Sequence, residues 1–390
     1  MADFIFSLNA TLPIFLIMVL GWFLMRIGLF TKEFNKVADK YVFKVALPVL
    51  LFKDIATADI RSDFNLAFVL FCMITTTIMF LAIWGLSYIF IKDKTQVGAF
   101  TQASARGSAA VLGIAFINNI YGNSGMAPLM IVSAVPLYNI LSVIILTFSA
   151  DMGKEAEKNK PDDNISNQIH KKSAVEKKSG ISGNYRGIKA DSAGVIKEVR
   201  NSKGYNIKKA CINVVKNPII IGIFLGLPFS IFGINIPAIP LKAVTSIAQT
   251  ATPIALLVVG AGFKGAKAVK RIKLTSIATF IKLVLLPLVF FPFAIAFGFR
   301  GSELVAILVM LGSPTTVTCY IMAKNMGNDE VLSSSIVVMA TLLSSVTLTG
   351  WIFVLKVMGL VCFHRAVAPP SLQSITRHLA LLHPPPAGPA

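Results

Sequence analysis

Long apolar stretches separated by short polar segments make up most of this chain. Several exceed the roughly 18 residues at which an apolar run becomes a candidate transmembrane helix. We interpret ten such stretches as membrane spans, which predicts an all-α polytopic membrane protein. The predicted spans are residues 5–25, 35–56, 65–91, 97–121, 125–149, 213–233, 239–263, 272–298, 303–324 and 330–358.

Two polar regions divide the chain into four parts. Residues 151–212 hold 14 Lys or Arg against 8 Asp or Glu and few large apolar residues, so they are predicted to be a mostly disordered linker. The proline- and histidine-rich residues 361–390 are predicted to be a disordered tail, because the irregular histidine spacing does not favour a metal site. Residues 1–150 and 213–360 are each predicted to form a five-helix unit.

The two five-helix units share residues at a fixed offset of 205 positions. Proline and glycine identities at one offset indicate an internal repeat. Since each copy has an odd number of spans, the second enters the membrane from the opposite side, and the repeats are inverted. Pro48 and Pro253 are expected to kink the second helix of each copy. The matched positions include Gly21 with Gly226, Pro48 with Pro253, Gly107 with Gly312, and Ser108 with Ser313.

Positive charge sets the predicted orientation. The chain has 37 Lys and Arg against 18 Asp and Glu, a formal net charge of +19. Nucleic-acid binding is one account of such a charge. However, the excess lies beside alternate ends of the predicted spans, as the positive-inside rule requires. We therefore expect a multi-pass plasma-membrane protein with its N-terminus outside, residues 151–212 in the cytoplasm, and no nucleic-acid partner.

Two of the predicted spans contain residues that interrupt helices. Residues 311–317 read Leu-Gly-Ser-Pro-Thr-Thr-Val, and a proline there removes a helical hydrogen bond and clashes with the preceding turn. Residues 106–111 have a Gly-Ser pair at the matching position. Non-helical backbone inside a bilayer must face protein or a water-filled cavity. Interrupted helices at corresponding places in two halves therefore predict a transporter's binding site.

The broken segments favour an anionic substrate. Half-helix N-termini present free N–H groups and a partial positive charge. Serine and threonine hydroxyls can bind a substrate there, or they can simply satisfy the broken backbone. All 18 Asp and Glu lie in loops or at span ends, so exchange of a cation through a buried carboxylate pair lacks its usual group. The candidate substrate-binding residues are Gly107, Ser108, Gly312, Ser313, Pro314, Thr315 and Thr316.

Three basic residues lie within or beside the predicted spans. Lys282 is in the middle of one, where a lysine is costly unless it is paired or hydrated. It could bind the anionic substrate, which would place it in the site, or it could contact the carbonyl ends of a broken helix. Lys44 and Arg106 are expected to extend their charged ends toward the membrane surface.

No catalytic set is visible, and we expect neither an enzyme nor a metal site. The histidines lie outside the predicted spans, so no Ser-His-Asp or Cys-His arrangement is available. Residues 260–265 fit the GxGxxG pattern, but they follow a predicted span rather than a β-strand, so they do not indicate dinucleotide binding. No cofactor is expected, and coupling to Na⁺ or H⁺ is left open.

Several motifs resemble the auxin efflux carrier family, especially its bacterial members. The resemblance covers about residues 1–150 and 210–360. It implies ten spans in two inverted repeats, a crossing of interrupted helices four and nine, and elevator-like alternating access. The motifs are residues 217–220 (Asn-Pro-Ile-Ile), residues 251–257 (Ala-Thr-Pro-Ile-Ala-Leu-Leu), Lys282 followed by Leu286-Pro287-Leu288, and residues 312–315 (Gly-Ser-Pro-Thr) continuing through Ala323-Lys324-Asn325-Met326.

The resemblance also implies a substrate class. Family substrates are organic anions, namely indole acetate in plant members and malate- or malonate-type acids in bacterial ones. The plant pattern has an Asn and then a Pro where this chain has Ser108 and Ala115, and a later family Pro falls at Cys319. These departures favour a small carboxylate over auxin.

The sequence therefore predicts a secondary transporter that moves a small, malate-like organic anion across the plasma membrane by alternating access. Two alternatives remain open. One is a sodium-coupled organic-anion symporter that holds Na⁺ with unwound carbonyls and hydroxyls. The other is a membrane receptor or scaffold that acts through the basic linker. The expected partners are the lipid bilayer and a small organic anion, and a homodimer is left open.

Overall fold

The computed structural model describes residues 2–57, 65–109, 117–118, 120–121, 125–158 and 211–361, and this part of the chain is almost entirely helical. Its one β-type contact is an isolated antiparallel bridge between Gly107 and Thr315. Five described helical stretches are long and apolar enough to cross a membrane. They are α4 (Leu66–Phe90), the first part of α7 (Ala127–Lys158), α11 (Ala238–Gly262), residues Ile272–Ala296 and α17 (Glu330–Val357).

Two other predicted spans are each made of shorter helices. Predicted span 35–56 consists of α2, η1 and α3 end to end, and predicted span 303–324 is divided between α15 and α16. Here η marks a π-helical segment. The bounds are α1 (Ala2–Arg26), α2 (Lys32–Tyr41), η1 (Val42–Ala46), α3 (Leu47–Ala56), α5 (Lys94–Ala105), α10 (Pro218–Phe232), α12 (Gly265–Lys270), α13 (Ile272–Phe280), η2 (Ile281–Leu285), α14 (Leu286–Ala296), α15 (Ser302–Gly312) and α16 (Thr318–Asn325).

The polar regions differ in part from their predicted bounds. Helix α7 continues to Lys158, into the segment predicted to be linker. The predicted disorder of the rest of the linker and of the tail concerns residues 159–210 and 362–390, which lie outside the described residues.

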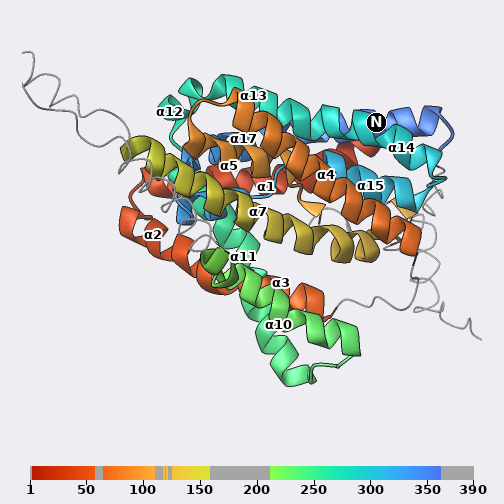
Figure 1. Ribbon diagram of the computed structural model, residues 1–390, viewed down its shortest axis with the longest axis horizontal. Helices are drawn as coiled ribbons and strands as arrows, with labels where there is room; N and C mark the ends of the chain where they lie inside the picture. Colours follow the sequence, from red (N-terminus) through yellow and green to blue (C-terminus); the bar gives the residue numbers. More distant parts are fainter. Residues whose placement is uncertain are drawn as a thin grey trace, which may run out of the picture.

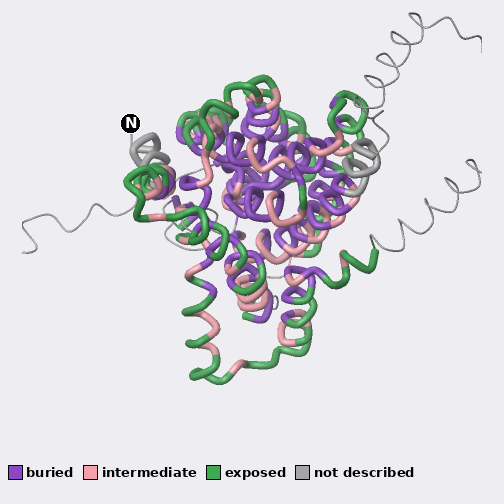
Figure 2. Tube along the Cα trace, turned by 90° about the vertical axis from the view of Figure 1, so that its left-hand side faces the viewer, coloured by how far each residue is buried: buried purple, intermediate pink, exposed green. Residues whose placement is uncertain are grey.

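The helices form two groups that pack side by side. The smaller bundle contains α1, the α2–η1–α3 helix, α10 and α11, and the larger bundle contains the other long helices. In Figure 1, α3, α10 and α11 lie below the layer of α4, α5, α7, α14 and α15. Figure 2 shows most of the buried residues in the larger bundle, whereas the protruding end of the smaller one is largely exposed. Helix α1 packs on both α11 and α17, so it lies between the two bundles.

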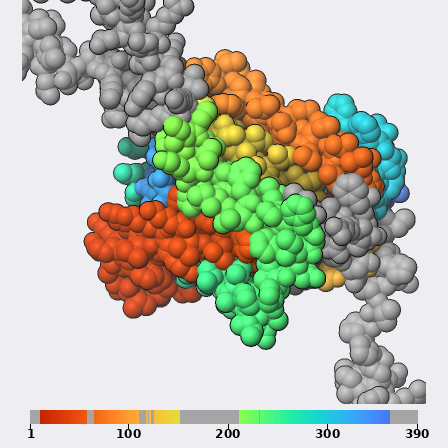
Figure 3. Space-filling model, turned by 60° about the horizontal axis from the view of Figure 1, so that its bottom comes forward, coloured from red at the N-terminus to blue at the C-terminus, as the bar shows by residue number. Residues whose placement is uncertain are grey.

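Glycines explain the close packing inside the smaller bundle. A Cβ added to Gly21 of α1 would clash with the backbone of Leu257 on α11, and one added to Gly226 of α10 would lie 2.9 Å from the carbonyl oxygen of Phe52 on α3. Small residues at such positions let membrane helices approach closely. The two contacts are related by the 205-residue offset, which pairs Gly21 with Gly226 and Phe52 with Leu257. Figure 3 shows the red N-terminal helices beside the green segment that follows the linker.

Two π-helical segments precede prolines in the middle of long helices. Segment η1 is followed by Pro48, and η2 is followed by Pro287. A wider π turn accommodates the missing N–H and the ring of a proline. Pro253, by contrast, lies inside α11, which is continuous from Ala238 to Gly262. A change of helix type therefore accompanies only the first of the two predicted kinks.

The basic segments meet at one end of the molecule. There Lys324 Nζ lies 3.1 Å from Asp39 Oδ2, and Lys264 Nζ lies 2.8 Å from Glu330 Oε1. Helices α2 and α12 lie at this end in Figure 1, and α15 lies toward the other. We call this the basic end. The shared location is what the charge pattern predicts, and the assignment of this end to the cytoplasm remains a prediction.

Candidate functional site

The two predicted helix breaks exist and lie in contact with each other. Helix α5 ends at Ala105 and α15 ends at Gly312, and the extended residues that follow pair side by side. Gly107 and Thr315 form the antiparallel bridge, and the Ser108 backbone N–H donates to the Pro314 carbonyl at 2.9 Å. We call this pairing the crossover.

Local sequence explains why the helices stop here. Pro314 has no N–H and restricts the residue before it to extended backbone, and Ser313 has φ −70° and ψ 155°. Gly107 leaves room for its neighbours, because a Cβ there would clash with the Ser313 hydroxyl and lie 2.9 Å from Lys282 Nζ. An alanine at position 107 would therefore have to displace the Ser313 hydroxyl and the Lys282 ammonium.

Lys282 joins the ends of the two broken helices. Its side chain is fully buried, and its ammonium donates to the Ala105 carbonyl at 3.0 Å and to the Met310 carbonyl at 3.1 Å. The Tyr138 hydroxyl donates to the same Met310 oxygen at 3.0 Å. Carbonyls at helix C-termini lack intrahelical donors and bear partial negative charge. Of the two roles considered for Lys282, the described contacts match the contact with helix ends.

The candidate hydroxyls divide into two kinds. The Thr315 hydroxyl donates to the Ala103 carbonyl at 2.6 Å, so it satisfies the interrupted backbone of α5. The Ser313 hydroxyl is buried and has no hydrogen-bond partner among the described residues. Ser108 and Thr316 are partly exposed and line the cavities beside the crossover. Gly312 packs against Pro287, whose Cγ would lie 3.0 Å from an added Cβ.

Two small cavities lie between the bundles at the crossover. The larger has a volume of about 50 Å³, and the other about 20 Å³. Both are lined by Ser108, Thr252 and Thr316, so these three side chains separate them. A volume of this size holds a few water molecules, not an organic anion. The larger, which we call the crossover cavity, is also lined by Leu47, Leu50, Leu51 and Asp54 of α3, Arg106, Gly107 and Ala109 of the break, Val135 and Tyr138 of α7, and Thr318 of α16.

Arg106 corrects one prediction. Instead of extending to the membrane surface, it is only 6% exposed and lines the crossover cavity. Its Nη1 donates to the sulfur of Met322 at 3.0 Å. The break places Arg106 in extended backbone after the last residue of α5, and this directs the side chain inward. Its position directly before a Gly-Ser break is the feature of the sequence that agrees with this inward direction.

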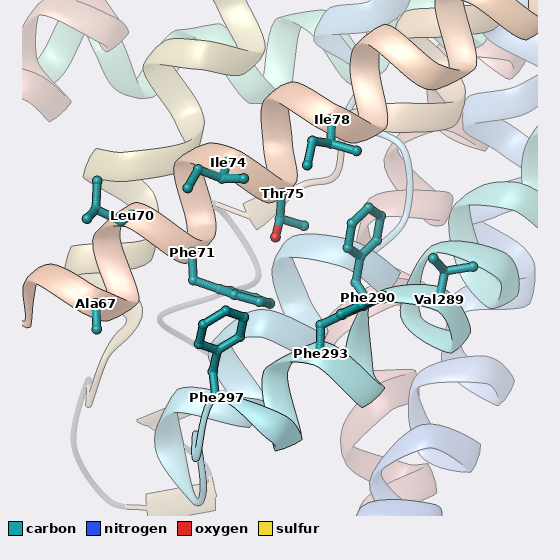
Figure 4. A pocket seen from close by; sticks show the side chains of 10 residues that line it. All are labelled: Ala67, Leu70, Phe71, Ile74, Thr75, Ile78, Val289, Phe290, Phe293 and Phe297. Carbon is teal, nitrogen blue, oxygen red and sulfur yellow. The ribbon is translucent and has the colours of Figure 1, made fainter.

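A larger cavity elsewhere in the molecule is a different kind of site. It has a volume of about 610 Å³ and lies between α4 and α14 (Figure 4). Its ten lining residues are apolar except for Thr75. Such a groove can accept a hydrocarbon chain, but it offers no group that would bind an anion. Size alone therefore does not identify the functional site.

The described residues include no group of three or more His, Cys, Asp or Glu side chains that could hold a metal ion. The polar groups at the crossover are buried cations, hydroxyls and the backbone groups of the interrupted helices.

Comparison with known proteins identifies the family of this chain. The family model described as "Membrane transport protein" matches residues 6–352. The chain is 24% identical over 359 residues to "Uncharacterized transporter YfdV" of Escherichia coli (strain K12), a match that covers 91% of this chain and 99% of that protein. Proteins of the same name from Escherichia coli O157:H7 and Shigella flexneri match equally well. The resemblance seen in the motifs is thus confirmed: this multi-pass membrane protein belongs to the family of membrane transport proteins that includes the auxin efflux carriers.

Proposed function

We propose that this protein is a secondary transporter that moves a small organic anion, such as malate, across the plasma membrane by alternating access. The observation that supports this most directly is the crossover. Two interrupted helices meet there, beside a cavity that lies between two helix bundles. Transporters use interrupted helices in this way because the freed backbone groups can bind a solute at the middle of the membrane.

Ten spans in two inverted repeats are part of the proposal. The 205-residue offset converts the Gly21–Leu257 contact into the Gly226–Phe52 contact, and this symmetry supports the inverted repeat. The breaks after α5 and α15 also occupy matching positions, since Gly107 and Gly312 differ by 205. Two structurally equivalent halves give a transporter two related conformations, each open to one side.

Differences between the two ends of the bundle interface support alternating access. At the basic end, two ion pairs join the bundles, Asp39 with Lys324 and Lys264 with Glu330. On the other side of the crossover, the cavity extends toward Asp54, near the end of α3. Because the cavity is too small for an organic anion, the bundles must move apart to admit one.

Sodium coupling is the alternative within transport. A sodium ion at the crossover would need carbonyl oxygens as ligands, and the Lys282 ammonium already contacts those at the ends of α5 and α15. We therefore expect uptake that does not require a sodium gradient.

Uptake of labelled malate into proteoliposomes tests the proposal. We expect saturable uptake, with and without a sodium gradient. The variants Ser108→Ala and Thr316→Val should each raise KM by about five- to tenfold, as expected for a lost hydrogen bond of about 1 kcal/mol. The controls are Ser246→Ala and Thr77→Val, whose exposed hydroxyls contact only their own helices.

Each contrary result has a separate meaning. An unchanged KM in both cavity variants would mean that the substrate does not bind at the crossover. A sodium requirement would favour the symporter. No uptake of malate or of other small carboxylic acids would overturn the transport proposal. Deletion of residues 160–205 tests the receptor or scaffold alternative, because a transporter should keep its flux without the linker.

A further inference from the structure

We propose that Arg106 binds the carboxylate of the transported anion. This inference rests on the proposed function and names the residue that recognises the substrate. It goes beyond the candidate set taken from the sequence, which placed the anion at the helix breaks and left Lys282 as the only counter-charge.

The burial of Arg106 requires a partner. The side chain is 6% exposed, and a guanidinium remains protonated under all ordinary conditions. A buried charge is strongly unfavourable unless an opposite charge or several hydrogen bonds compensate it. The contact recorded for Arg106 is with the sulfur of Met322, which is a weak acceptor. The residue therefore has donors in excess of the acceptors around it.

The protein's own carboxylates do not supply that partner among the described residues. The nearest candidate in the cavity wall is Asp54, and its carboxylate pairs with Lys53 at 2.8 Å. The other described ion pairs join Asp39, Asp329 and Glu330 to basic residues other than Arg106. Arg106 thus lines the cavity, and no carboxylate of the described residues lies within ion-pair distance of it.

The surroundings of Arg106 fit a small carboxylate. Guanidinium N–H groups match the two oxygens of a carboxylate in a forked geometry. Ser108 and Thr316 line the same cavity and can donate to an oxygen atom of the bound anion. The facing wall is formed by Leu47, Leu50 and Leu51 of α3, which suits a short carbon chain. Since α3 belongs to the other bundle, the anion would bind between the two moving parts.

Kinetics and binding of Arg106 variants test the inference in the full chain. For malate uptake, Arg106→Gln should raise KM at least about 30-fold, which corresponds to the loss of about 2 kcal/mol for one member of a buried charged pair. Arg106→Lys should recover part of this loss, because lysine keeps the charge but not the fork. The matched control is Arg300→Gln, since the Arg300 guanidinium donates to the carbonyls of Ile295 and Phe299, away from the crossover.

A binding measurement separates this inference from the transport proposal. Thermal stabilisation of the detergent-solubilised protein by malate, lactate and the neutral amide of lactate is compared between wild type and Arg106→Gln. We expect the wild type to prefer the acids over the amide and the variant to lose that preference. If the acids bind through Arg106 without flux, Arg106 is still a carboxylate-binding residue, and it is the transport proposal that fails.

Two results would overturn the inference. The first is normal malate uptake with an unchanged KM in Arg106→Gln, which would leave the transport proposal intact. The second is the absence of both uptake and binding for every acid, which would contradict both the proposed substrate class and the proposed role of Arg106.

Discussion

Two buried cations lie beside the same crossover in very different surroundings. Lys282 donates to the carbonyls that end α5 and α15 and lines neither crossover cavity. Arg106 contacts a methionine sulfur and lines the crossover cavity. A cation whose hydrogen bonds are satisfied by the fold supports the fold, whereas a cation without an acidic partner is available to a ligand. Buried charge alone therefore does not identify a binding residue, because the groups that contact the charged side chain decide its role.

The largest expected effect on stability is that of Lys282→Met. This variant removes two charge-assisted hydrogen bonds and leaves the Ala105 carbonyl without this donor, so we expect a loss of about 3 kcal/mol. Arg106→Met should cost less than about 1 kcal/mol or stabilise the protein, because it removes a buried charge that has no acidic partner. Denaturant titration in detergent measures both, with Lys242→Met on the exposed face of α11 as the control. Equal losses of stability in the two variants would contradict the different roles assigned to Lys282 and Arg106.

Gly107→Ala should have the next largest effect. The added Cβ would clash with the Ser313 hydroxyl and lie 2.9 Å from Lys282 Nζ, so these two buried side chains must shift. We expect a loss of about 2 kcal/mol, typical of overpacking, together with reduced flux. Gly85→Ala is the matched control, since a Cβ at Gly85 of α4 would meet nothing within 4 Å and alanine favours the helix. Wild-type stability of Gly107→Ala would contradict the tight packing around Lys282.

Asp39→Asn should alter access to the cavity more than stability. Asp39 is 4% exposed, and its ion pair with Lys324 joins the bundles at the basic end. Without this pair the basic end should open more readily. A thiol introduced by Thr252→Cys, in a background with Cys211→Ser and Cys362→Ser, should then react faster with an impermeant reagent added from that end. We expect a rate about two- to fivefold higher, for a change of about 0.5 to 1 kcal/mol. An unchanged labelling rate from both sides would mean that this ion pair does not control the opening of the basic end.

Lys264→Gln should have the smallest effect. Its ion pair with Glu330 also joins the bundles, but the two side chains are 49% and 31% exposed. Exposed pairs contribute at most about 1 kcal/mol, so we expect labelling and stability close to wild type. The difference between Asp39→Asn and Lys264→Gln measures how much burial strengthens an ion pair that crosses the interface. A larger effect in Lys264→Gln would reverse that conclusion.

Sequence reasoning succeeded where covalent chemistry dictates local structure. Pro314 cannot continue the hydrogen bonding of α15, and the Gly-Ser pair at 107–108 marks the matching break, so both interruptions were predictable. The burial of Arg106 was not predictable by the same means. An arginine beside a break can extend to the surface or turn inward, and its direction depends on helices α3, α7 and α16, which meet it only in the folded protein.

The amino-acid pattern alone predicts the helical class, the transport family and the places where two helices stop, because apolar length, proline and glycine act through the chain's own geometry. The packing of distant helices sets which carbonyls Lys282 contacts, which hydroxyls satisfy backbone groups and which face a cavity. It also encloses Arg106 with no carboxylate partner among the described residues. Those outcomes depend on contacts between residues roughly 200 positions apart, such as Thr315 with Ala103 and Gln102 with Cys319. No local pattern specifies such contacts, since packing of distant helices selects among conformations that each segment could adopt alone.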